Sequence, residues 1–315
     1  MATGNVGERP DVLVSNPHPS RMHRALFALI LTIAAAASLQ AQARDSLTAG
    51  YSPAECPPCA EWNAATPPVR LFGNVHYVGT RGLSAILLTS SAGHILIDAG
   101  LPESAPRIIA SIAALGYRVE DVKLIVTSHT HYDHVGGLAA LERASGAVVA
   151  ARAPAATTIE RGTSGPEDPQ FRSALEFPPV PDVRVIDDGD TLRVGDIVVT
   201  AHATAGHTAG GTSWSWRSCE KGECADFVYA DSQTPISDDG YLFTQNPATL
   251  RDFERGFATL ERLPCDVLLT PHPQASQMWE RVEQKRLEDP EACRRYATNA
   301  RRQLDRRIAT EREAR

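Results

Sequence analysis

The segment TSHTHYDHVGG, residues 127–137, is the part of this 315-residue chain from which fold and site can be predicted. It directly follows Val122–Val126, a short apolar run typical of a buried strand. Because alternate residues at a strand end point to the same side, His129 and His131 can converge on one metal ion. Imidazole nitrogens suit zinc, and a catalytic zinc ion keeps an open position for water.

Further ligands are needed, because three histidines and one aspartate in this segment are too few for two ions. Asp133 and His134 lie beyond the turn, where they can face a neighbouring ion. Two more histidines follow predicted strands, one in Ala205–Thr208 and one in Pro271–Pro273, where glycine or proline lets the backbone turn sharply. The economical partition places His129, His131 and His207 on one zinc ion and Asp133, His134 and His272 on a second.

Two zinc ions indicate a hydrolytic reaction. Zinc lowers the pKa of a bound water to about 7, and a second ion can stabilise charge on a leaving group. An amide nitrogen is a poor leaving group, so such help lowers the barrier directly. We predict that Asp133, His131 and His207 carry the reaction. Most lone histidines are structural, and we assign that role to His76, His94 and His202.

The rest of the chain predicts one α/β domain. Short β-branched runs at 84–88 and 94–97 read as a meander, and strands recur at 183–186, 191–201, 212–216 and 227–230. Helices are expected over 106–115 and 248–263, where apolar residues recur on one face. The segment Pro154–Pro181 is rich in Pro, Gly and Thr, and we expect part of it to be a long loop. This pattern favours two packed sheets with helices outside.

The N-terminal region has the features of a secretory signal peptide. Met22-His23-Arg24 precedes an apolar run over 25–37 and the site Ala41-Gln42-Ala43. We therefore expect residues 1–43 to be a presequence cleaved near Ala43, and residues 44–315 to be a periplasmic or secreted domain. The alternative is an N-terminal anchor that stays uncleaved, although the run is short of the roughly 20 residues that span a membrane.

Cysteine content and charge agree with an exported protein. Six cysteines suit complete pairing outside the cytoplasm. Cys219 and Cys224 flank a predicted hairpin tip, and Cys56 and Cys59 lie in a Pro-rich stretch that favours a structural bridge over a redox motif. The net charge of −7 argues against nucleic acid as a partner. We expect a monomer that makes no membrane contact after cleavage.

With these motifs in place, the sequence resembles the metallo-β-lactamase superfamily. Residues 127–137 match its metal motif, and Leu96–Gly100, Ala205–Thr208 and Thr270–His272 follow in the family's order. The resemblance covers nearly everything from Phe72 to His272. It implies an αββα sandwich with metals at one sheet edge, and it implies that Asp98 supports the ligands.

Within the superfamily, the chain resembles a β-lactamase of the third subclass. Ser232 stands where other subclasses place a cysteine ligand, and the second-zinc set Asp133, His134 and His272 is that of the third subclass. The resemblance implies a disulfide between Cys265 and Cys293, and it implies that Ser232 and Thr234 hold the substrate carboxylate. It also implies that a bridging hydroxide attacks penicillins, cephalosporins and carbapenems in a groove lined by 154–181 and 231–241.

The position of Asp231 in the sequence is also compatible with other hydrolases of the superfamily. It lies about where glyoxalase II and the lactonases of the superfamily place an aspartate that bridges both metals, and we predict that here it faces away from them. The alternative function is an exported hydrolase of another lactone or ester, with the same metals. A binding module that has lost catalysis is a third hypothesis, but such a module would be expected to have lost ligands, and all six are present.

Overall fold

Successive residues within a strand pack into two different hydrophobic layers, because side chains of an extended chain point alternately to opposite faces. In β5 (Val122–Val126), Val126 belongs to a central core, whereas Ile125 packs on the other side of the strand. In β11 (Glu223–Tyr229), Phe227 belongs to the same central core and Val228 to a third cluster. Both faces of these strands are therefore buried, which requires helices outside the sheets.

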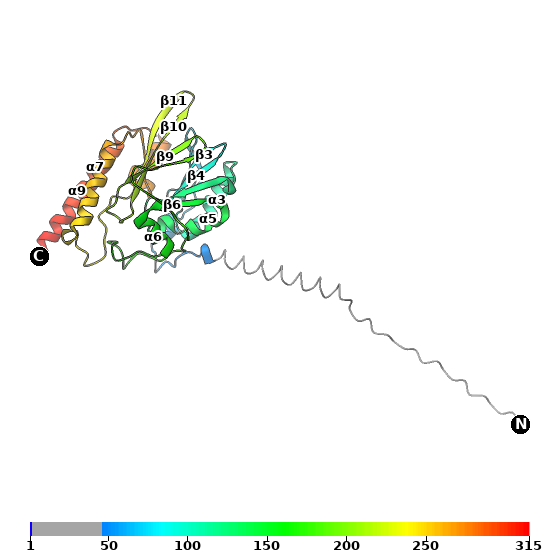
Figure 1. The fold of residues 1–315 in the computed structure, drawn as a ribbon, viewed down its shortest axis with the longest axis horizontal. Helices are drawn as coiled ribbons and strands as arrows, with labels where there is room; N and C mark the ends of the chain where they lie inside the picture. Colours follow the sequence, from blue (N-terminus) through cyan, green and yellow to red (C-terminus); the bar gives the residue numbers. More distant parts are fainter. Residues whose placement is uncertain (2–45, 315) are drawn as a thin grey trace. The chain divides into compact units, whose positions relative to one another are not determined.

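Two sheets meet across the central core (Figure 1). The first has seven strands in chain order: β1 Val69–Phe72, β2 Val75–Tyr77, β3 Ile86–Ser90, β4 Gly93–Ile97, β5, β6 Val148–Arg152 and β7 Arg184–Ile186. The second has the order β12-β11-β10-β9-β8, with β8 Thr191–Val194, β9 Ile197–Ala203, β10 Thr212–Glu220 and β12 Val267–Leu269. The strands β4 to β7 run parallel, as do β11 and β12, so their carboxyl ends share an edge where loops can converge.

Helices cover both outer faces, which confirms the expected αββα architecture. The helices on the first sheet are α3 Ala105–Ala114, α5 Leu138–Ser145 and α6 Ala153–Arg161, and those on the second are α7 Pro247–Arg262 and α9 Ala292–Glu313. The shorter helices are α2 Cys59–Trp62, α4 Tyr132–Val135, α8 Met278–Glu283 and the 3₁₀ turns Pro102–Ser104, Val119–Asp121, Phe243–Gln245 and Pro273–Ser276.

Two elements of the structure differ in detail from those predicted from the sequence. The strand expected over 191–201 is a hairpin of β8 and β9, because Gly195 adopts φ of 60° and turns the chain. The first third of the expected loop 154–181 is helical, since α6 continues to Arg161 and ends at Gly162 with φ of 78°. The irregular part of the loop therefore begins after Gly162.

All six cysteines form disulfides. The pairs are Cys56–Cys59, Cys219–Cys224 and Cys265–Cys293. The second closes the hairpin of β10 and β11, and the third joins the start of β12 to α9. The structural bridges expected from the sequence are thus confirmed.

The computed structural model describes residue 1 and residues 46–314. The predicted signal peptide and its cleavage site near Ala43 lie outside the described residues. Ser46–Arg315 form one compact unit. Among the described helices, none is both long enough and apolar enough to cross a bilayer.

Glu311 bonds the end of α9 to the 3₁₀ turn Phe243–Gln245, which lies between β11 and α7. Its side chain is buried, and its two oxygens accept hydrogen bonds from the amides of Phe243 (3.0 Å) and Thr244 (2.9 Å). Arg307 donates a third bond at 2.9 Å. Burial alone would raise the pKa of Glu311, but these bonds together lower it.

We predict that Glu311→Gln destabilises the protein by about 2 kcal/mol, because the amide places a donor against a backbone donor. Urea unfolding at neutral pH measures this loss. Since the pKa of Glu311 is depressed in the folded state, its contribution is present above the ordinary pKa of glutamate and fades as the pH falls through the lowered value. The exposed Glu313→Gln is the matched control, and equal losses in both variants would refute the role of Glu311.

Candidate metal centre

One buried carboxylate holds the loop between β5 and α4 in place. Asp98 follows β4, is fully buried and has φ of 63°. Its Oδ1 accepts a hydrogen bond from the Ser128 amide at 2.6 Å, and its Oδ2 accepts bonds from the hydroxyls of Ser128 (2.7 Å) and Tyr229 (2.6 Å). Because Tyr229 ends β11, Asp98 ties this loop to both sheets. This is the supporting position expected for Asp98.

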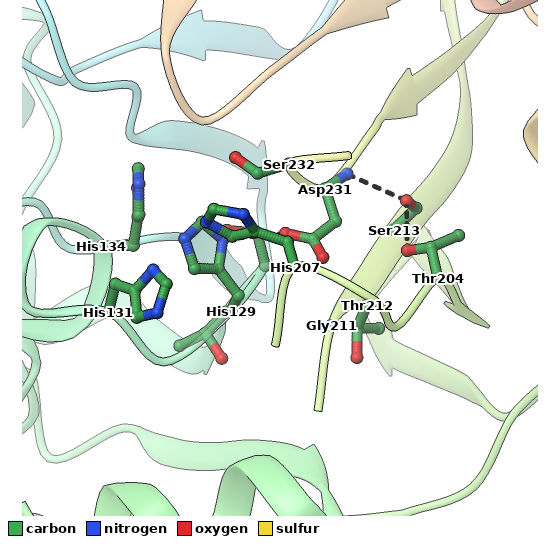
Figure 2. Close-up of polar contacts among 12 residues, drawn as sticks. His129, His131, His134, Thr204, His207, Gly211, Thr212, Ser213, Asp231 and Ser232 are labelled. Atoms are coloured by element: carbon green, nitrogen blue, oxygen red, sulfur yellow. Dashed lines mark hydrogen bonds and ion pairs between the residues drawn. The ribbon is translucent and has the colours of Figure 1, made fainter. Parts of the chain in front are cut away.

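Three histidines form the first group of metal donors. His129 and His131 come from the loop after β5, and His207 comes from the turn between β9 and β10. Each offers one nitrogen, and these atoms lie within 4.8 Å of one another. Gly206 shapes the turn with φ of 141°, a region that favours glycine. Figure 2 shows the three rings gathered together.

The other nitrogen of each ring is bonded to the protein. The bonded pairs are His129 Nδ1 with Asp231 Oδ1 (2.8 Å), His131 Nε2 with Asp168 Oδ2 (3.0 Å) and His207 Nδ1 with the carbonyl oxygen of Thr234 (2.9 Å). Acceptors at these positions fix the ring orientation and leave the opposite nitrogen for a metal. The available donors are therefore Nε2 of His129 and His207 and Nδ1 of His131.

The second group gathers around Asp133. Its Oδ2 lies 3.2 Å from Nε2 of His134 and 3.3 Å from Nε2 of His272, which follows β12. Asp133 and His134 also form a group within 4.8 Å together with His129, whose ring centroid is 4.3 Å from that of His134. The structure thus brings all six expected ligands together, with His129 between the two groups.

The residues present fit a metal ion. Both ring nitrogens of His134 are buried and make no well-aligned hydrogen bond within the described residues, although Nε2 lies 3.2 Å from Oδ2 of Asp133 and Nδ1 lies 3.7 Å from Oδ2 of Asp98. Buried polar atoms are rarely left unsatisfied in proteins, and an ion would supply the missing partner. The donors are imidazole nitrogens and a carboxylate, which are zinc ligands.

The charge states of His129, His207 and Asp133 suit metal binding, whereas the contact with Asp133 raises the pKa of His272 against the effect of burial. Burial and the neighbouring histidines hold the pKa of His129 well below its usual value, and burial lowers that of His207 to about 3. Both rings are therefore neutral at pH 7. Burial alone would raise the pKa of Asp133, but His134 and His272 outweigh it and hold this pKa well below its ordinary range. Neutral imidazole and ionised carboxylate are the forms that bind metal.

Asp231 lies behind the first donor group. It is fully buried, its amide donates to Ser213 Oγ at 2.9 Å, and its Oδ1 bonds Nδ1 of His129. Its Oδ2 packs so close to Gly211 that a Cβ there would meet it at 2.3 Å. Asp231 belongs to neither donor group. This placement suits a residue that supports His129, and the absence of a bond from Asp231 to metal stays a prediction.

A cavity of about 760 Å³ opens beside these donors. Ser232 and Thr234 line it, together with residues from both segments expected to form the groove, among them Gln170 and Ile236. The Ser232 hydroxyl makes no hydrogen bond to another described residue, and Figure 2 shows it directed away from the Asp231 carboxylate. The Thr234 hydroxyl lies 3.2 Å from Nδ1 of His207.

Sequence reasoning missed Asp168 and the two carbonyl groups that bond ligand histidines. Asp168 lies in the irregular loop after α6, where no periodicity or spacing relates it to His131. The carbonyl oxygen of Gly82 lies 3.3 Å from Nδ1 of His272, and that of Thr234 bonds His207. Every residue carries a carbonyl group, so the sequence holds no signal for these two contacts.

Comparison with known proteins places this architecture in one family. The family model described as the metallo-beta-lactamase superfamily matches residues 78–293. The Rm3 metallo-beta-lactamase is 52% identical, with 82% of this chain and 99% of that chain covered and a TM-score of 0.80. MEM-A1, a subclass B3 metallo-beta-lactamase from a soil metagenome library, is 41% identical, with 81% and 100% covered and a TM-score of 0.79.

A curated relative is similar over a shorter stretch. The N-acyl homoserine lactonase of Bacillus cereus is 34% identical over 74 residues, which cover 16% of this chain and 30% of the lactonase. The chain thus spans less than a third of that enzyme's length. The family model instead covers residues 78–293, which include all six donor residues, and the two solved structures cover about four-fifths of the chain. The chain therefore belongs to the metallo-beta-lactamase superfamily and resembles its subclass B3 β-lactamases.

Proposed function

We propose that this protein is an exported β-lactamase that holds two zinc ions and hydrolyses the lactam amide of penicillins, cephalosporins and carbapenems, thereby conferring antibiotic resistance. The observation that carries the proposal is a cluster of five histidines and Asp133, with no cysteine among them, in which all but the fully buried His134 line one cavity. The proposal is supported by the 52% identity to the Rm3 metallo-beta-lactamase over 82% of the chain.

The residues of the site have distinct tasks. Bound zinc ions would supply a water of pKa about 7 and positive charge for the carbonyl oxygen and the leaving nitrogen. His129, His131 and His207 would hold one ion, and Asp133, His134 and His272 the other. Asp133 stays ionised at neutral pH, so its carboxylate can accept a hydrogen bond from the attacking water and orient it.

The substrate carboxylate would lie against Ser232 and Thr234. The Ser232 hydroxyl is available to donate, because no described residue accepts its proton. The Thr234 hydroxyl is shared with His207. We propose that the protein acts as a monomer and binds a small-molecule substrate in this cavity.

Export is proposed from the N-terminal signal and the cysteines. Three disulfides suit an oxidising compartment, which for an exported bacterial protein is the periplasm or the medium.

Hydrolysis of another lactone or ester is the second candidate. The local likeness to N-acyl homoserine lactonases favours it, as does the place of Asp231 in the sequence, although in the structure Asp231 belongs to neither donor group. The extent of the likeness to β-lactamases, which covers about four-fifths of the chain, favours the first candidate.

We predict that the purified protein hydrolyses a chromogenic cephalosporin and a carbapenem, and that a chelator abolishes turnover until zinc is restored. The same panel includes an acyl-homoserine lactone and S-lactoylglutathione. Activity confined to the lactone or the thioester would refute the β-lactamase proposal.

We predict that Ser232→Ala raises KM for a carboxylate-bearing cephalosporin about tenfold with little change in kcat, since one charge-assisted hydrogen bond is lost. Steady-state kinetics with the methyl ester of the same substrate provide the control, because the ester lacks the charged partner. If the variant weakens turnover of acid and ester equally, Ser232 does not bind the carboxylate.

A further inference from the structure

Asp168 brings the loop over the cavity into contact with the first donor group. Its side chain is buried, with 6% of its surface exposed, although the surrounding residues 163–183 contain no helix or strand. Its Oδ2 lies 3.0 Å from Nε2 of His131 and accepts a bond from the Ser164 hydroxyl at 2.8 Å. Its Oδ1 accepts a bond from the Gln170 amide at 2.8 Å.

This arrangement determines which nitrogen of His131 is free. Ser164 and the Gln170 amide occupy both oxygens of Asp168 as donors, so Nε2 of His131 must also donate to this carboxylate. The neutral ring then carries its proton on Nε2 and presents the lone pair of Nδ1. A carboxylate on the far nitrogen also makes an imidazole a more basic ligand.

The same loop is also bonded to the segment after β11. Asp238 of that segment accepts bonds from the Arg172 amide (2.6 Å) and the Ser173 hydroxyl (2.5 Å), and its own amide donates to the Pro169 carbonyl at 2.9 Å. Gln170 and Ser173 of the loop line the cavity. The loop therefore contacts a metal donor through Asp168 and the segment 231–241 through Asp238.

The other ligand histidines have different partners. Asp231, the partner of His129, lies two residues beyond β11 and is fully buried, and the partners of His207 and His272 are backbone carbonyl groups. Asp231 and Thr234 stand on the irregular segment 230–242, whereas Asp168 is the partner that stands on the irregular loop 163–183. Irregular segments open at lower free-energy cost than the sheet framework.

We infer that Asp168 is a positioning residue for His131, and that through it the affinity of the first metal site depends on the position of the loop 163–176. When the loop is fastened by Asp238, Asp168 holds His131 with Nδ1 toward the metal. When the loop moves away, His131 loses its partner and becomes a weaker ligand. The inference rests on the proposed metal site but not on the identity of the substrate.

The test measures zinc affinity in the absence of any lactam, by titrating a chromophoric chelator against the zinc-loaded protein. Asp168→Asn places an amide NH₂ against one of three donors, so we expect the Kd of the first site to rise about 10- to 100-fold. The absorption spectrum of the cobalt-substituted variant should change as well, because the geometry at His131 is altered.

A control variant separates the contact of Asp168 from a general change of charge on the loop. The exposed Glu167→Gln removes a neighbouring carboxylate whose ion pair is with Arg161. It should keep the wild-type Kd and cobalt spectrum. A wild-type Kd in Asp168→Asn, or an equal loss in Glu167→Gln, would overturn the role of Asp168.

A further variant tests the dependence on the loop. Asp238→Ala touches no metal donor but releases the outer end of the loop, so we expect a rise in Kd that is smaller than that of Asp168→Asn. An unchanged Kd in Asp238→Ala would overturn the link between loop position and metal affinity. Because no substrate is present, loss of the β-lactamase proposal alone would leave these outcomes unaffected.

Discussion

The buried carboxylate of Asp98 is the contact on which the position of the metal centre depends. A buried charge is costly unless hydrogen bonds compensate it, and Asp98 accepts three, from Ser128 and Tyr229. These partners follow β5 and end β11, so one side chain connects the ligand loop to strands of both sheets. A shift of either sheet would leave the charge unpaired. The placement of His129 and His131 therefore follows from the packing of the whole sandwich.

Much of this arrangement could be predicted from the sequence, because it depends on local patterns. Alternating apolar residues predict strands with two buried faces, and histidines placed directly after such strands must meet at the shared edge. Long-range details could not be predicted in this way. The contact of Asp168 with His131 spans 37 positions and involves a loop without periodicity. The expected strand over 191–201 is interrupted at Gly195, which has a left-handed backbone conformation. The run of β-branched residues on both sides gives no indication of this turn.

The ligand histidines form hydrogen bonds with several different kinds of partner. One ring bonds a carboxylate two residues beyond β11, one bonds a carboxylate on the loop after α6, and two lie against backbone carbonyl groups. Low pKa values keep His129 and His207 neutral, so protons compete weakly for these nitrogens at neutral pH. The framework thus prepares the site for a cation, and the loop after α6 adds a support through Asp168 that we propose depends on the position of the loop.

Diffraction at the zinc absorption edge from crystals grown with excess zinc tests the central claim most directly. If the six donor residues hold two zinc ions, we expect two anomalous peaks. One is bonded to Nε2 of His129, Nδ1 of His131 and Nε2 of His207, and the other to Asp133, His134 and His272. A single peak, a bond from Asp231 to both ions, or six side chains without metal would contradict it.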